Sequence, residues 1–140
     1  MGKLVDQYKL NETDADRARQ TEIFLAFCKA LKVSGIQSPD QAPQDAVIIA
    51  PDLSWRKNAE IKFRNHAFGT FQTYTIDRTK LDEITAGETS FLIVSWCGDI
   101  RYAEIENPER FKVTRQKRRD RDELPDEVYH VPLDLFKKVA

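Results

Sequence analysis

The chain has 140 residues, a length that fits one domain, and 41% hydrophobic with 32% charged residues is the composition of a globular protein. No run of 18 apolar residues occurs, which excludes a membrane-spanning helix, and the N-terminal segment lacks the apolar core of a signal peptide. Two cysteines, Cys28 and Cys97, exclude a disulfide scaffold and argue against a zinc site. We therefore expect residues 1–140 to form a single cytoplasmic domain without a membrane segment.

The net charge of −1 hides a local asymmetry. From Arg110 to Arg121 the sequence holds seven basic residues and one acid, so we interpret residues 110–127 as a charged loop or arm. A basic segment on a nearly neutral protein favours local contact with a polyanion. The alternative is a solvated charge run that the following acids neutralise. The residues expected to contact nucleic-acid phosphates are Arg115, Lys117, Arg118 and Arg119.

The first half of the sequence predicts one helix and then three strands. The helix covers residues 13–31, where Thr13 and Asp16 resemble a capping box and apolar residues recur at helical spacing. Gly35 and two prolines after it predict a loop. The predicted strands are residues 46–50, 59–64 and 70–76, the first two joined as a hairpin.

The second half predicts a short helix through Leu81 and Ile84, capped by Asp77 or Thr79. Further predicted elements are a strand at 91–96, a tight turn, a strand at 100–105, an edge strand at 128–131 and a helical turn from residue 133. The order α-β-β-β-α-β-β predicts an α/β fold with a central mixed β-sheet flanked by helices.

Glu60 and Lys62 are two residues apart on a predicted strand, so their side chains leave the same face of the sheet. The strand is otherwise apolar, and burying an unpaired charge is costly. The two charges either pair with each other or, together with a second carboxylate, hold a divalent cation.

Two aspartates can supply that second carboxylate. A hairpin turn centred near Ser54 places Asp45 opposite Phe63, within one side-chain reach of Glu60. Asp52 is the alternative; it follows a proline but lies close to the turn. The strand geometry favours Asp45.

An acid before one strand and Glu-x-Lys on the next, with a helix before and an αβ unit after, resembles the PD-(D/E)xK nuclease superfamily. The resemblance covers roughly residues 13–105, and its further marks are AEIKFRN, an extended TFQTYTI, the lysine-bearing DRTKLDEI and FLIVSW. It implies a restriction-endonuclease-like core, which consists of a helix, a three-strand meander, a helix and a further strand.

The resemblance also implies the role of each site residue. Asp45, or alternatively Asp52, and Glu60 would ligate Mg²⁺, for which Mn²⁺ can substitute. The backbone carbonyl group of Ile61 often completes such a site, and Lys62 would orient the attacking water or stabilise developing charge. The implied activity is hydrolysis of DNA phosphodiester bonds by a metal-dependent endo- or exodeoxyribonuclease.

Two further residues are candidates. Many members add a glutamate from the first helix, and Glu22 is the candidate here. Arg64 is the next residue on the face of Glu60 and Lys62, where it either binds a DNA phosphate or is merely exposed.

Two other readings compete with catalysis. One is a catalytically inactive module of the same fold that binds nucleic acid or a partner protein, and the other is an interaction protein that acts through the basic arm alone. An aspartate that meets Glu60 favours the enzyme. A domain this small cannot wrap a duplex, which favours a homodimer or a larger protein partner. The motif fits duplex, branched and single-stranded DNA, and RNA, equally well.

Overall fold

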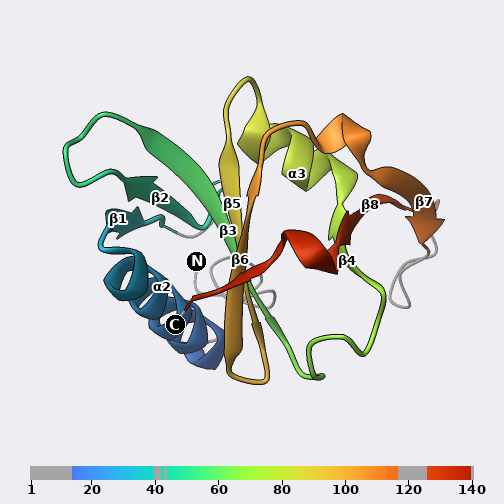
Figure 1. Ribbon diagram of the computed structural model, residues 1–140, viewed down its shortest axis with the longest axis horizontal. Coiled ribbons are helices and arrows are strands. Elements are labelled where there is room, and N and C mark those ends of the chain that lie inside the picture. Colours follow the sequence, from blue (N-terminus) through green and yellow to red (C-terminus); the bar gives the residue numbers. More distant parts are fainter. Residues whose placement is uncertain (1–13, 40–41, 43, 117–125, 140) are drawn as a thin grey trace, which may run out of the picture.

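The computed structural model describes residues 14–39, 42, 44–116 and 126–139. Within these residues the chain forms two α-helices and nine strands, and the strands make one large and one small sheet. The large sheet runs through the middle of the molecule and the small sheet lies to one side of it (Figure 1).

The large sheet has six strands in the order β1-β2-β3-β5-β6-β9. Their bounds are β1 Ser34–Gln37, β2 Ala46–Ile49, β3 Arg56–Arg64, β5 Ser90–Trp96, β6 Asp99–Ile105 and β9 Lys137–Lys138. β3 and β5 are parallel, whereas the other neighbours are antiparallel. The predicted central mixed sheet is therefore confirmed.

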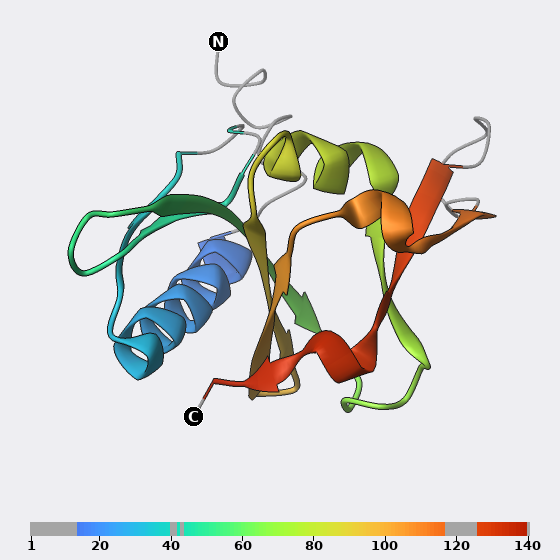
Figure 2. The ribbon, with the colours of Figure 1, turned by 45° about the horizontal axis from the view of Figure 1, so that its top comes forward.

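Different elements cover the two faces of this sheet (Figure 2). Helix α2 (Asp14–Leu31) packs on one face through Ile23, Phe24 and Phe27. Helix α3 (Arg78–Thr85) and the small sheet cover the other face. The N-cap of α3 is Asp77, whose side chain accepts a hydrogen bond of 3.0 Å from the Thr79 N–H.

Strand β5 is buried on both faces, which explains the apolar run FLIV at its centre. Phe91 and Ile93 belong to the core under α2. Leu92 and Val94 belong to the second core, which the small sheet and α3 close. A strand between two covered faces shows no polar alternation, so the sequence identifies it by its apolar run.

Strand β1 was expected as a loop because glycine usually interrupts regular structure. In the structure Gly35 pairs with Ile48 inside the sheet. A Cβ atom at this position would lie 2.8 Å from Phe24 Cε1, so glycine allows β1 to approach α2 closely. Four strands therefore precede α3 instead of the predicted three.

The predicted strand at 70–76 was expected to continue the central sheet, and this expectation was wrong. β4 (Thr73–Asp77) pairs with β8 (Asp126–Pro132) in the small sheet of order β4-β8-β7. β3 already has β2 on one side and β5 on the other, so no edge remains for β4. The predicted edge strand at 128–131 is consequently the central strand of the small sheet.

The segment expected as a charged loop or arm is partly regular structure. A 3₁₀-helix, η1 (Pro108–Arg110), leads into β7 (Lys112–Gln116), which pairs with β8. Val113 anchors β7 by packing against the second core. Lys117, Arg118 and Arg119 lie outside the described residues.

The predicted helical turn from residue 133 is the 3₁₀-helix η2 (Leu133–Leu135). The core sequence of α2, the meander β1-β2-β3, α3 and then β5 beside β3 is the arrangement that the sequence resemblance implies. In the part of the chain that the structure describes, no helix is long and apolar enough to cross a membrane.

Candidate metal and catalytic site

The register of the β2–β3 hairpin decides which residues meet. Ala46 pairs with Ala59, so Asp45, one residue earlier, lies opposite Glu60 and not opposite Phe63 as predicted. The turn comes earlier than expected because the Ala50 N–H closes it by donating to the Trp55 carbonyl group at 3.0 Å.

Asp52 fixes that turn and takes no part in the site. Its carboxylate accepts hydrogen bonds from the Ser54 N–H and hydroxyl group at 3.1 and 2.6 Å, and Leu53 adopts a positive φ of 65°. These bonds lower the pKa of Asp52, which is fully exposed. Asp52 and Asp45 lie at opposite ends of β2, so of the two aspartates Asp45 is the one brought to Glu60.

Asp45 is held by two bonds to β3. Its backbone N–H donates to the carbonyl group of Ala59 at 3.0 Å, and its carboxylate accepts from the Ile61 N–H at 2.8 Å. The side-chain carboxylate thus accepts the hydrogen bond from β3 that a backbone carbonyl group would accept if β2 extended beyond Asp45. Because the N–H and C=O of one strand residue point to the same side of the strand, the carbonyl group of Ile61 is directed toward this same edge.

Glu60 is 1% exposed, and its Oε1 atom has no hydrogen-bond partner among the described residues. Lys62 Nζ lies 3.4 Å from Oε2, and Lys80 Nζ lies 3.8 Å from Oε1. Burial, followed by the charge of Asp45, raises the pKa of Glu60 to about 7, although the two lysines act in the opposite direction. A carboxylate with this pKa changes charge near neutral pH.

Tyr74 and Arg64 border the two carboxylates. The hydroxyl group of Tyr74 is buried without a hydrogen-bond partner among the described residues, and burial raises its pKa. Arg64 lies over the Tyr74 ring at 4.7 Å and donates to the carbonyl group of Thr75 at 3.3 Å. These contacts fix the Arg64 guanidinium group next to the site. The side chain is half-buried, so Arg64 is not merely exposed.

A cavity of about 330 Å³ opens beside Asp45, between β3 and α2. The residues of α2 that line it are Asp16, Arg19, Gln20 and Ile23, which share one helix face. Glu22, the expected helix glutamate, is exposed and does not line the cavity. It precedes Ile23 by one residue, and one residue turns a helix by about 100°.

Lys80 and Tyr74 were missed as site residues from the sequence. Lys80 comes from α3 and Tyr74 from the small sheet, so both reach Glu60 through tertiary contacts. The lysine in DRTKLDEI was noted as a family mark, and this is the signal that pointed to Lys80.

The donor set suits a hard divalent cation. It comprises the carboxylates of Asp45 and Glu60 and the backbone carbonyl group of Ile61, all of them oxygen. Mg²⁺ often binds through one or two carboxylates and keeps several water ligands. Among the described residues the buried Oε1 atom of Glu60 has no hydrogen-bond partner and only the Lys80 ammonium group at 3.8 Å as an ion pair. This supports the fit, since a buried oxygen is costly without a hydrogen bond. Among the described residues, no group of three or more His, Cys, Asp or Glu is placed to hold a metal.

Comparison with known proteins finds one solved structure and no matching family model or curated protein. The structure is that of Hjc, a Holliday junction resolvase from the archaeal hyperthermophile Archaeoglobus fulgidus. It is 13% identical to this chain, with a TM-score of 0.48, and the match covers 89% of this chain and 96% of that one.

Proposed function

We propose that this protein is a metal-dependent nuclease that hydrolyses DNA phosphodiester bonds at Asp45, Glu60 and Lys62. The observation that carries the proposal is the Glu60 carboxylate, which is buried beside a second carboxylate and has an oxygen without a hydrogen-bond partner among the described residues. A purely structural ion pair of Glu60 with a lysine would not require Asp45, whose negative charge repels that of Glu60.

Each residue has a separate part in the proposed reaction. Asp45 and Glu60, with the carbonyl group of Ile61, hold Mg²⁺ or Mn²⁺, which when bound lowers the pKa of its water and neutralises charge on the phosphate. The hydrogen bond from the Ile61 N–H orients the Asp45 carboxylate. Lys62, whose side chain is 45% exposed, lines the cavity and can reach a phosphate oxygen or the attacking water.

Cations further from the carboxylates would hold the DNA. Arg64 and Arg115 are the described members of the set expected from the sequence, and Arg115 is exposed on β7. In the cavity Arg19 lies over the ring of Phe63 at 4.4 Å, which fixes a guanidinium group near the site. A homodimer or a larger partner would supply the additional surface that a duplex requires.

Cleavage assays test the proposal. The purified chain is incubated with plasmid, linear duplex and circular single-stranded DNA in Mg²⁺, Mn²⁺ or EDTA. We expect cleavage with either metal and none in EDTA, and cutting of a circle would identify an endonuclease. Glu60→Gln and Asp45→Asn should each lower the rate more than about a hundredfold, because charge stabilisation by a bound metal contributes several kcal/mol.

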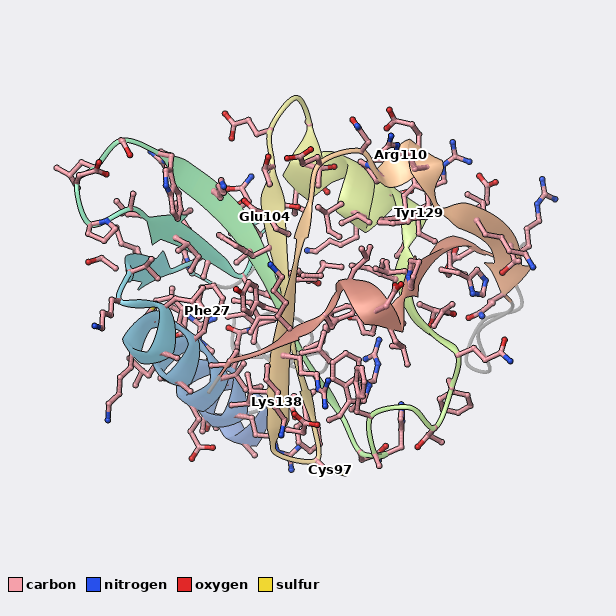
Figure 3. All side chains as sticks on the ribbon, viewed as in Figure 1. Phe27, Cys97, Glu104, Arg110, Tyr129 and Lys138 are labelled. Atoms are coloured by element: carbon pink, nitrogen blue, oxygen red, sulfur yellow. The ribbon has the colours of Figure 1, made fainter. Side chains whose placement is uncertain are left out.

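Two matched controls use the same chemical changes outside the site. Glu104→Gln alters an exposed glutamate on β6 that pairs with Lys57 and is labelled in Figure 3. Asp52→Asn alters the turn aspartate but keeps the side-chain oxygen that accepts from Ser54. Both should cut like the parent. Failure of the folded parent to cut any substrate with either metal would overturn the proposal, and so would equal cutting by all four variants.

The inactive nuclease-fold module is the second candidate. The observation in its favour is that the described residues provide two carboxylates and no third acid for a metal, while Lys62 and Lys80 already offset the charge of Glu60. In that case the parent would bind DNA without cutting it, and binding would be the same in Mg²⁺ and in EDTA.

A further inference from the structure

A second, larger cavity of about 750 Å³ lies between the end of β3 and the small sheet. Among the described residues that line it, three are Arg or Lys and none is Asp or Glu, although the chain as a whole carries a charge of −1. We refer to it as the basic groove. Its cations are Arg64, Arg110 and Lys112.

The floor of the basic groove is apolar and rigid. Trp96 and Tyr74 are buried there with their rings edge to face at 5.9 Å. His130 ties the small sheet together, because its ring nitrogens contact the Thr73 and Thr114 hydroxyl groups at 3.0 and 2.6 Å. Both nitrogens are thus engaged, and His130 serves as part of the wall.

One aromatic side chain stands at the opening of this groove with most of its surface exposed. Phe71 is 61% exposed, yet its ring is fixed edge to face against His66 at 4.8 Å. The loop that carries Phe71 is held by Phe68, which packs on Trp96 at 5.0 Å, and by a hydrogen bond of 2.7 Å from the Thr70 hydroxyl group to the Ala67 carbonyl group. The ring is therefore presented to solvent by a well-anchored loop.

The groove borders the site. Arg64 and Tyr74 line the groove, and Arg64 follows Glu60 and Lys62 on the same face of β3. A chain of phosphates that passes Lys62 and Arg64 would reach Arg110 and Lys112 across the small sheet.

From this geometry we infer that the basic groove binds an unpaired segment of the DNA substrate, with one base stacked on Phe71 and the flanking phosphates on Arg110 and Lys112. A duplex hides the faces of its bases within the stack, whereas a single strand offers them to an exposed aromatic ring. The cations of a lining whose described residues include no acid complement the phosphates. The inference rests on the proposed nuclease function and names its substrate class as single-stranded DNA or the unpaired part of a branched one.

Binding measured in EDTA tests the groove separately from catalysis. The probe is a fluorescein-labelled single strand of about 16 nucleotides, compared with the blunt duplex of the same length. Fluorescence anisotropy reports the affinity of the parent, Phe71→Ala and the double variant Arg110→Ala/Lys112→Ala. Circular dichroism confirms that each variant is folded.

The matched controls lie outside the groove. Leu135→Ala removes an exposed apolar side chain on η2, and Lys137→Ala/Lys138→Ala removes two exposed cations on β9. Figure 3 shows Lys138 near α2 and Arg110 at the other side of the molecule, by η1.

We expect the parent to bind the single strand more tightly than the duplex. Phe71→Ala should lower single-strand affinity about tenfold and duplex affinity much less, because stacking of a base on the ring is lost. The double variant should reduce the slope of log K against log salt concentration by about 1.4, the value for two single-strand phosphate contacts. Both controls should bind like the parent.

Parent-like single-strand binding by Phe71→Ala would overturn the inference, as would equal losses on single strand and duplex or tighter binding of the duplex by the parent. Glu60→Gln separates the two proposals, since it should lose cleavage and keep single-strand binding. A parent that binds through the groove but never cuts would overturn the nuclease proposal alone. If the parent cuts DNA but Phe71→Ala binds the single strand as tightly as the parent does, only the groove proposal is overturned.

Discussion

The β2–β3 hairpin and the small sheet both carry charge, but they expose it differently. At the hairpin, Glu60 is 1% exposed and its neighbours are fixed to within a few ångströms. On the small sheet, Lys112 and Arg115 are exposed, and the part of the groove lining that the structure describes contains no acid. Buried charge acts through a few short contacts in a medium of low polarity, whereas exposed charge acts weakly and is screened by salt.

This contrast teaches where catalysis and where binding are expected. A buried carboxylate beside a half-buried one is stabilised by a cation bound between them, and a shift of strand register would separate the two carboxylates. An exposed basic surface attracts a polyanion along its length and tolerates substitution of any single residue. The predictions below test the contrast in order of expected effect.

The largest effect in this series is expected for the two lysines that contact Glu60. Lys62→Ala should lower the cleavage rate about a hundredfold, because a cation that acts on the water or on developing charge is lost. Lys80→Ala should lower it about tenfold, since Lys80 is the more distant cation, at 3.8 Å against 3.4 Å. Single-turnover cleavage measures both rates. Equal losses would mean that both lysines merely offset the charge of Glu60.

The pKa of Glu60, about 7 against an ordinary value of 4.5, predicts a pH dependence of metal binding. Bound metal requires the ionised carboxylate, so Mn²⁺ affinity should fall about tenfold for each pH unit below 7 and level off above it. Calorimetric titration with Mn²⁺ between pH 5.5 and pH 8 measures this, at values chosen to span a pKa of about 7. A Mn²⁺ affinity that does not change over this pH range would contradict a role for Glu60, with its raised pKa, as a metal ligand.

The same shift has a consequence for stability. Between the two pKa values the folded chain keeps a proton that the unfolded chain releases, so without metal the stability falls as pH rises from about 4.5 to about 7. Glu60→Gln removes this loss and should raise the Tm above that of the parent at pH values above about 7, with little difference near 4.5. Added Mg²⁺ should stabilise the parent and not the variant.

The smallest effect is expected on the small sheet. Arg115→Ala removes an exposed cation that faces Glu127 across the β7–β8 pair. Single-strand affinity should fall about twofold and the salt slope should change by less than about 1, because one exposed contact contributes little. Anisotropy across a salt series measures this. A loss of single-strand affinity of about a hundredfold, as large as the loss of cleavage rate expected for Lys62→Ala, would contradict the division between the two regions.

Part of the site was predictable because it depends on local geometry. The two-residue period of a strand places Glu60 and Lys62 on one face whatever the rest of the chain does. The position of Asp45 before β2 followed from the hairpin, although the register was predicted three positions away from the observed Glu60. The turn itself depends on the bonds of Asp52 to Ser54, which a count of residues does not reveal.

Other parts were predicted incorrectly because competing interactions decided them. Gly35 predicts a loop after the helix, yet its lack of a side chain is what allows β1 to pack beside Phe24. Glu22 satisfies the pattern of a helix glutamate, but the docking of α2 through Ile23 and Phe27 turns it to solvent. Such outcomes depend on how one element is rotated relative to its neighbour, and the periodicity of side chains along either element does not determine that rotation.

The sequence alone determined the α/β class, the buried strand β5 and the shared face of Glu60 and Lys62, because each follows from the periodicity of apolar and polar side chains along one segment. The tertiary structure decided that Lys80 and Tyr74 approach Glu60 and that the strand after β3 starts a second sheet. The physical reason is that these contacts join segments distant in sequence, and their geometry is set by which sheet edges are already paired and which faces are already covered.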